Sequence, residues 1–207
     1  DAFLKLLETP DREIVSTTAL KIDSLAEHSR QTATQYDLLM VKGENRAEML
    51  PHLPAIQPIE NPDLTLIASG FGHRIHPIYK ISKMHNGIDF SAPVGTPIKA
   101  TGKGVVEEVI RSGRGLGNQV VIDHGFGYKT RYACMDEIGV RRGQEVTRGQ
   151  IIGTVGDSGL SVAPHLHYEV HLRGEPVNPI NYFVLEVDPR EYDRLILISM
   201  MSGQSFD

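Results

Sequence analysis

Two short groups of residues could bind a metal ion. Asp89 follows His85 four residues later, and one leucine separates His165 from His167. Neutral imidazoles and a carboxylate suit Zn²⁺, and two histidines with one aspartate leave a fourth tetrahedral position for water, as in catalytic zinc sites. Because both patterns are short enough to arise by chance, the surrounding sequence decides how they are interpreted.

The segment that contains His165 and His167 predicts a β-strand with one polar face. Residues 165–172 alternate strictly, with His165, His167, Glu169 and His171 on one face and Leu166, Tyr168, Val170 and Leu172 on the other. Residues two apart on a strand have Cα atoms about 6.6 Å apart, so both imidazoles can serve one small site. Two interpretations stay open: a functional face, or an edge strand whose polar face meets water.

His85 and Asp89 cannot converge on a flat strand, because four residues separate their Cα atoms by about 13 Å. Between them, Asn86 and Gly87 favour a turn and disfavour a helix. We therefore expect the chain to bend at this dipeptide and to bring both side chains to one point. The alternative is a His–Asp hydrogen bond that only holds a turn.

The elements that must position these residues are short β-strands. Runs typical of strands alternate with glycine-containing turns at residues 97–100, 104–110, 119–123, 129–133, 151–155 and 166–172. No helical stretch between them is long enough for the crossover of a parallel sheet. The sequence therefore predicts a mainly β fold, with antiparallel strands in a sandwich or half-barrel.

Different patterns flank this β-rich region. Residues 11–42 contain no Gly or Pro, and a stripe at helical spacing predicts one or two helices packed on another surface: Val15, Thr18, Ile22, Leu25, Ser29, Thr32, Tyr36 and Leu39. Prolines 51, 54, 58 and 62 predict an extended linker laid over a surface.

A capping pattern predicts a helix near the C-terminal end of the sequence. Asp188 is suited to the N-cap, Pro189 to the first helical position and Glu191 to a capping box, and Gly203 is placed to end the helix. Its expected buried stripe is Tyr192, Leu195, Ile196 and Ser199. The predicted division is a helical N-terminal arm (1–50), a proline-rich linker (51–66), a β domain (67–184) and a C-terminal helix (185–207).

Composition excludes several classes of protein. The 207 residues are 40% hydrophobic and 23% charged, which is typical of a globular protein. A net charge of −5 argues against a nucleic-acid binder, and no apolar run is long enough for a membrane span. A single cysteine excludes an internal disulfide and a cysteine-rich zinc site. Because the sequence starts at Asp1, we expect that a signal or anchor segment has been removed.

The residues around the metal-binding patterns resemble lysostaphin-type (LytM-like, M23) zinc metallopeptidases. The similarity spans about residues 67–183 and is carried by G-F-G-H-R-I-H-P at 70–77, H-N-G-I-D-F at 85–90 and P-H-L-H at 164–167. The resemblance implies an antiparallel β fold whose groove is crossed by the metal site. It implies Zn²⁺ bound by His85, Asp89 and His167, with His165 beside the metal as a catalytic residue.

The same resemblance implies a substrate and a location. The expected activity is endopeptidase cleavage of peptide bridges or stems in bacterial peptidoglycan, and the partners are therefore peptidoglycan peptides. The expected location is the cell envelope, periplasmic or extracellular. In one arrangement of the full-length protein, the removed segment anchors it to the membrane.

One position departs from the family pattern. The family usually has a second catalytic histidine in a Tyr-x-His segment, which here reads Tyr132-Ala133-Cys134. Cys134 has three interpretations: a small buried residue in a strand, a thiolate that reaches the zinc and displaces water, or a substitution that disables the enzyme. All three lower the expected activity, and we expect zinc to be retained while turnover is weak or absent.

Four further residues are candidates for the substrate groove or for supporting the site. Arg74 and His76 are expected to line the groove, although a structural salt bridge is an equal alternative for Arg74. Asn118 is expected to bond either a loop or the substrate backbone. Glu169 shares the face of His165 and His167 and could orient an imidazole from behind.

A second hypothesis is a non-catalytic relative that binds cell-wall peptide or activates a partner hydrolase. Relatives of that kind usually lose the zinc ligands, and this sequence keeps all three.

The N-terminal arm has three open interpretations, namely a stalk, a dimerising element or a lid. The sequence fixes neither the bond that is cut nor the oligomeric state.

Overall fold

The computed structural model describes residues 18, 21–27, 29–30, 47–61, 64–75, 82–185 and 192–197. The chain divides into two compact units, residues 1–42 and 43–207. In the first unit, residues 21–27 and 29–30 are helical, as predicted for the arm. Ile22 and Leu25 of the predicted apolar stripe are 60% and 73% exposed. The four-part division of the chain stays a prediction.

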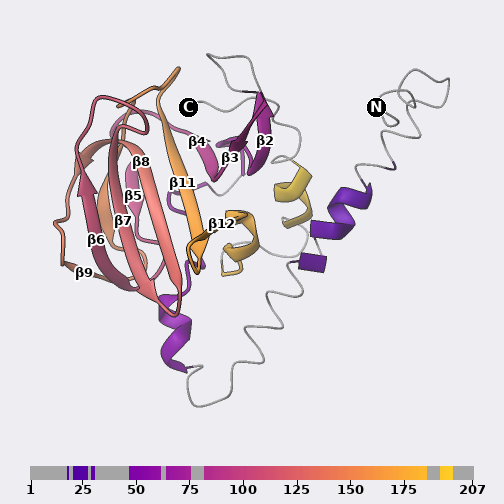
Figure 1. The fold of residues 1–207 in the computed structure, drawn as a ribbon, viewed down its shortest axis with the longest axis horizontal. Coiled ribbons are helices and arrows are strands. Elements are labelled where there is room, and N and C mark those ends of the chain that lie inside the picture. The colour runs from indigo at the N-terminus through magenta and orange to yellow at the C-terminus, as the bar shows by residue number, and fades with distance from the viewer. Residues whose placement is uncertain are drawn as a thin grey trace. The chain divides into compact units, whose positions relative to one another are not determined.

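The second unit is built from antiparallel β-strands (Figure 1). Its strands are β1 (Ile67–Ser69), β2 (Gly72–Ile75), β3 (Ser82–His85), β4 (Ile88–Ser91), β5 (Pro97–Lys99), β6 (Gly104–Ile110), β7 (Asn118–Gly125), β8 (Tyr128–Ile138), β9 (Glu145–Val146), β10 (Ile151–Val155), β11 (His165–Leu172) and β12 (Glu175–Val177). Two short 3₁₀ helices, η1 (Leu50–His52) and η2 (Pro179–Tyr182), flank them. The mainly β, antiparallel fold is as predicted, and the six expected runs correspond to β5, β6, β7, β8, β10 and β11.

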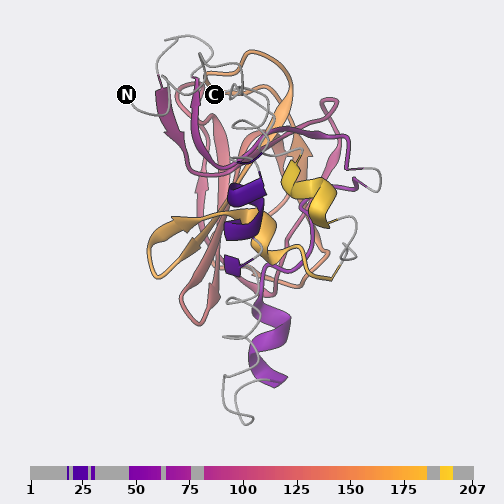
Figure 2. The ribbon, with the colours of Figure 1, turned by 90° about the vertical axis from the view of Figure 1, so that its right-hand side faces the viewer.

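Ten strands form one sheet, whose main path runs β1-β4-β11-β8-β7-β6-β9. β10 pairs with both β8 and β5. β12 folds back on β11, and β2 and β3 form a separate hairpin (Figure 1; Figure 2 shows the same fold from the side). β11 has β4 on one side and β8 on the other. The interpretation of 165–172 as an edge strand is therefore wrong, because both of its backbone edges are paired.

The apolar face of β11 packs into the core of the domain. Tyr168 stacks on Phe183, with ring centroids 6.2 Å apart, and its hydroxyl lies 2.9 Å from Thr101 Oγ1. Tyr132 of β8 contacts the same threonine, whose amide donates to the Tyr132 hydroxyl at 2.9 Å. Since these rings anchor one face of β8 and β11, the side chains on the opposite face are held in fixed positions.

The proline-rich segment packs against this domain. Apart from η1 it is irregular, as predicted, and Leu53, Ala55 and Ile59 are buried. The amide of Ala55 donates to Thr101 O at 3.1 Å, and the amide of Lys99 donates to Pro58 O at 2.7 Å. The segment therefore lies over the domain beside β5; the proline spacing predicted a segment laid over a surface but did not indicate which surface.

Residues 192–197 form a short helix (yellow in Figure 2). Tyr192, Leu195 and Ile196 of the predicted stripe are buried, and the Tyr192 hydroxyl donates to Asn181 Oδ1 at 3.2 Å. The predicted capping and ending residues and Ser199 lie outside the described residues. Within the described part of the chain, no helix is long and apolar enough to cross a membrane.

Candidate metal centre

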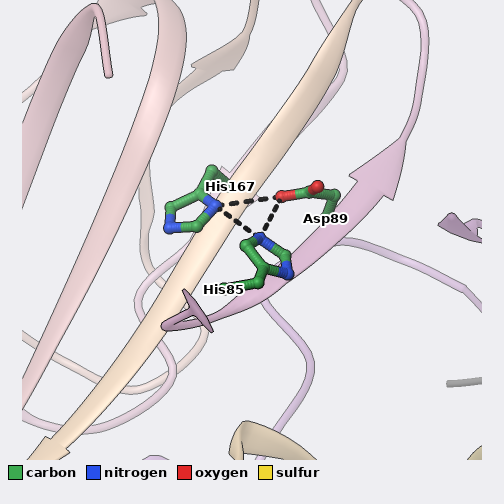
Figure 3. Close-up of side chains that lie close together, drawn as sticks. All are labelled: His85, Asp89 and His167. Atoms are coloured by element: carbon green, nitrogen blue, oxygen red, sulfur yellow. Dashed lines mark hydrogen bonds and ion pairs between the residues drawn. The ribbon is translucent and has the colours of Figure 1, made fainter. Parts of the chain in front are cut away.

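His85, Asp89 and His167 bring three potential ligand atoms together (Figure 3). Asp89 Oδ1 lies 3.0 Å from His85 Nε2 and 2.9 Å from His167 Nδ1, and these two nitrogens are 3.1 Å apart. All three side chains are buried. Residues that are 82 positions apart in the sequence therefore converge on one point.

Two local features make this convergence possible. β3 ends at His85 and β4 begins at Ile88, so the chain bends at Asn86 and Gly87 as predicted. A Cβ atom on Gly87 would lie 2.3 Å from the carbonyl oxygen of Tyr168, so only glycine allows the bend to lie this close to β11. The register of β4 and β11 then places Asp89 directly opposite His167.

The hydrogen-bond partner of the outer nitrogen of each imidazole fixes the orientation of the ring and the position of its proton. His85 Nδ1 lies 2.7 Å from the carbonyl oxygen of Gly70, and His167 Nε2 lies 3.1 Å from Glu169 Oε1. Because these oxygens only accept, each outer nitrogen carries a proton, and in the neutral imidazole each inner nitrogen then presents a lone pair. With both imidazoles neutral, these three atoms about 3 Å apart repel one another, and a cation bound between them relieves the repulsion.

This set of donors fits zinc. Ligands that lie 2.0–2.2 Å from a Zn²⁺ ion at tetrahedral angles are about 3.3–3.6 Å apart. The 2.9 to 3.1 Å between these three atoms is only slightly shorter. A histidine ligand that donates its other N–H to a carbonyl or carboxylate is also typical of metal sites. His85, Asp89 and His167 could therefore hold the ion, with the remaining position open.

The surrounding charges keep both carboxylates of this region ionised. Burial by itself would raise the pKa of Asp89, but without a metal ion the attraction and hydrogen bonds of protonated His85 and His167 rings hold that pKa below its usual value. Burial would likewise raise the pKa of Glu169, but hydrogen bonds with His167 and His171 and the charge of Arg131 hold it well below its usual value. An ionised Asp89 can bind a cation, and an ionised Glu169 accepts from His167.

Glu169 connects the candidate ligands to two more side chains. Its Oε2 lies 2.7 Å from His171 Nε2 and 3.4 Å from Arg131 Nε, while Oε1 faces His167. The carboxylate is thus held from three directions. The expectation that Glu169 could orient an imidazole agrees with this geometry, whereas the contribution of Arg131 was missed, because cross-strand pairs are not visible in a single strand.

His165 lies on the same strand face, and its partner is Cys134. His165 Nδ1 lies 2.8 Å from the carbonyl oxygen of Ala163, which leaves Nε2 as the unprotonated nitrogen, 3.4 Å from Cys134 Sγ. Both side chains are fully buried. Among the described residues, the cluster that could hold a metal does not include Cys134, which disfavours the interpretation of this thiol as a metal ligand.

A β-bulge turns Cys134 toward His165. The β7–β8 register shifts between the Asn118–Met135 and Val120–Tyr132 pairs, and Cys134 has a φ of 60°. In a regular strand Cys134 would share the core face of Tyr132, so the bulge is what re-aims the thiol. Histidine is among the residues enriched at positive φ, so this backbone would also accept the histidine that the family pattern has here.

Two of the other predicted residues contact the protein itself. The Arg74 guanidinium donates to the carbonyl oxygens of Gly70, Phe71 and His73, and burial lowers its pKa. Asn118 accepts from the amide of Ser112 and donates to the carbonyl of Met135, which agrees with the loop-bonding alternative. His76 lies outside the described residues.

A cavity of about 150 Å³ lies at the centre, lined by Lys83, Met84, His85, Asn86, Leu116, His167 and Glu169. Lys83 and Leu116 were missed by the sequence analysis. The available signal for Lys83 was its position two residues before His85, which places both side chains on one face of a strand. Leu116 had no such signal, because it reaches the cavity from a loop.

Comparison with known proteins identifies relatives of part of this chain. Residues 83–179 match the model of peptidase family M23. The peptidoglycan DD-endopeptidase ShyA of Vibrio cholerae is 49% identical over 113 residues, which are 54% of this chain and 26% of ShyA. The chain spans about a quarter of the length of the curated relatives that it matches first.

Two crystal structures resemble the β-rich region. A zinc-containing peptidase from Vibrio cholerae is 45% identical with a TM-score of 0.51, and the match covers 55% of this chain and 35% of that one. The catalytic domain of lysostaphin from Staphylococcus simulans is 32% identical with a TM-score of 0.51, and the match covers 58% of this chain and 94% of that domain.

Proposed function

Since the chain belongs to peptidase family M23, we propose that it is a zinc metalloendopeptidase that cleaves peptide bonds in bacterial peptidoglycan. The observation that carries this proposal is the convergence of one ligand atom each from His85, Asp89 and His167 on one buried point. The similarity to ShyA supports peptidoglycan peptides as substrates. The zinc-containing relative supports the identity of the metal. A peptidoglycan substrate favours a location in the cell envelope, periplasmic or extracellular.

The roles of the residues follow from their protonation. Zinc in such a site acts as a Lewis acid that polarises a carbonyl and makes water a stronger nucleophile near neutral pH. His85, Asp89 and His167 would hold the ion, and Glu169 would keep the Nδ1 lone pair of His167 directed inward. His165, whose Nε2 is unprotonated, would take up a proton from the nucleophile and return it to the leaving amine.

Cys134 attenuates this chemistry in the proposed enzyme. Its Sγ occupies the space in front of His165 Nε2, and a thiol is a weak hydrogen-bond donor and therefore a poor partner for an oxyanion. A general acid–base group contributes typically about 10²–10⁴ in rate. We therefore expect the chain to bind zinc but to turn over slowly.

Digestion of purified muropeptides tests this function. The chain, its Cys134→His variant and a Cys134→Ser control would be compared, with zinc content measured for each. We expect one zinc per chain in all three proteins and a rate at least about 10²-fold higher in Cys134→His alone. No hydrolysis by Cys134→His, with zinc retained, would favour the second hypothesis of a non-catalytic peptide-binding or hydrolase-activating protein. Absence of zinc from all three would contradict the metal centre itself.

A further inference from the structure

The hairpin beside the metal centre has an excess of positive charge. From residue 64 to residue 88 the sequence has no Asp or Glu, but it contains Arg74, Lys80 and Lys83. The whole chain, in contrast, has a net charge of −5. β2 and β3, which form this hairpin, therefore present cations next to the candidate site.

Lys83 is the cation that reaches the site. It lies two residues before His85 on β3, so both side chains share one strand face with Cα atoms about 6.6 Å apart. Its side chain is exposed and lines the 150 Å³ cavity together with His85 and His167. Among the described residues, no carboxylate forms an ion pair with Lys83.

The acidic residues closest to the cavity pair with other side chains and not with Lys83. Asp89 is fully buried and engaged by both histidine ligands. Glu169 lines the cavity, but its two oxygens face His167, His171 and Arg131. The other cavity neighbours of Lys83 include Met84 and Leu116, which have no charge.

The strand register places a second cation directly opposite Lys83. Arg74 is its cross-strand partner in the β2–β3 hairpin, and like charges at such positions destabilise a sheet. The Arg74 guanidinium donates to carbonyl oxygens of its own loop, so the lysine is the member of the pair that faces the cavity. Repulsion between the two cations lowers the stability of the hairpin, whereas an anionic ligand bound between β3 and the metal centre would offset this repulsion.

We propose that Lys83 binds a carboxylate of the substrate peptide, carried by the residue next to the scissile amide. This inference rests on the proposed function and adds a determinant of specificity to it. The ammonium donates to the carboxylate while the amide lies at the metal centre, so peptides with a free carboxylate at this position bind better than their amidated forms. Charge-assisted hydrogen bonds of this kind are stronger than neutral ones.

Calorimetric binding to two matched ligands tests this role without requiring turnover. The ligands are cross-linked stem-peptide dimers that differ only in the carboxylate next to the scissile amide, free in one and amidated in the other. For the zinc-loaded chain we expect the free acid to bind about tenfold more tightly. Lys83→Met should reduce this preference to less than about twofold, whereas Lys83→Arg should keep it, because the charge remains.

The control is Lys103→Met, which removes another exposed lysine, between β5 and β6, and should keep the tenfold preference. Zinc content and the circular dichroism spectrum should be the same in all variants. Equal affinity of the chain for the two dimers, or a preference unchanged in Lys83→Met, would overturn the role of Lys83 but not the proposed function. If neither dimer bound, both the inference and the proposed substrate would be wrong.

Discussion

The two faces of the β8–β11 strand pair bury polar groups in opposite ways. On the core face, the hydroxyls of Tyr132, Tyr168, Thr101 and Thr130 form a continuous network at 2.9 to 3.1 Å. Hydroxyls both donate and accept, so each can satisfy its neighbours. On the site face, the inner atoms of the three candidate ligands are all acceptors when the two imidazoles are neutral.

This difference separates a structural network from a site for a ligand. The core network is complete within the protein, and a buried network with all partners present rigidifies the fold. The triangle on the site face lacks a donor when both imidazoles are neutral, and a bound cation would then complete it. Burial of polar residues therefore does not by itself indicate function, whereas an excess of acceptors over donors does.

The largest expected effect is the loss of zinc from an Asp89→Ala variant. Removal of the carboxylate takes away one of three ligands and the only anionic one, so zinc content after dialysis should fall from about one per chain to background. Asp157→Ala, which removes an exposed aspartate, is the matched control and should keep its zinc. Retention of zinc by Asp89→Ala would show that the ion is held elsewhere.

The second effect is a pH dependence of the free energy of unfolding, caused by His124, which contacts Thr130 of the core network. His124 is buried and its Nε2 lies 2.8 Å from Thr130 Oγ1, and burial lowers its pKa from 6.5 to about 4. The unfolded chain therefore binds more protons than the folded chain between these values, so the free energy of unfolding falls as the pH drops from 6.5 to 4. This shift corresponds to about 3 kcal/mol.

Urea unfolding of the zinc-free protein at pH 7 and pH 4.5 measures this contribution. His124→Gln should show a smaller loss of stability between the two pH values than the unmodified chain. Removal of zinc from both proteins excludes the competing effect of protons on the metal ligands. An identical pH dependence in the two proteins would mean that His124 is not buried in its neutral form.

The smallest expected effect is that of Thr101→Val, the core-face counterpart of Asp89→Ala. The substitution leaves the Tyr132 and Tyr168 hydroxyls without their shared partner, which should lower the free energy of unfolding by about 1–3 kcal/mol. Zinc content should be unchanged, because Thr101 serves the opposite face. Urea denaturation measures the first quantity and metal analysis the second. A loss of zinc in Thr101→Val would contradict the independence of the two faces.

Several features of this protein were determined by the sequence alone. The strict alternation of residues 165–172 predicted β11 and its polar face, and the Asn86-Gly87 dipeptide predicted the bend between β3 and β4. These features were predictable because they depend on neighbours within a few residues. β1 to β4 were not identified as strands, since each has only three or four residues and little alternation.

Only the tertiary structure decided how these pieces form a site. The register of β4 against β11 put Asp89 beside His167, and a bulge in β8 turned Cys134 toward His165. The β2–β3 register placed Lys83 opposite Arg74. The physical reason is that a strand's own residues fix which side chains share a face, whereas strand pairing over long sequence distances fixes which faces meet, and a shift of one residue reverses them all.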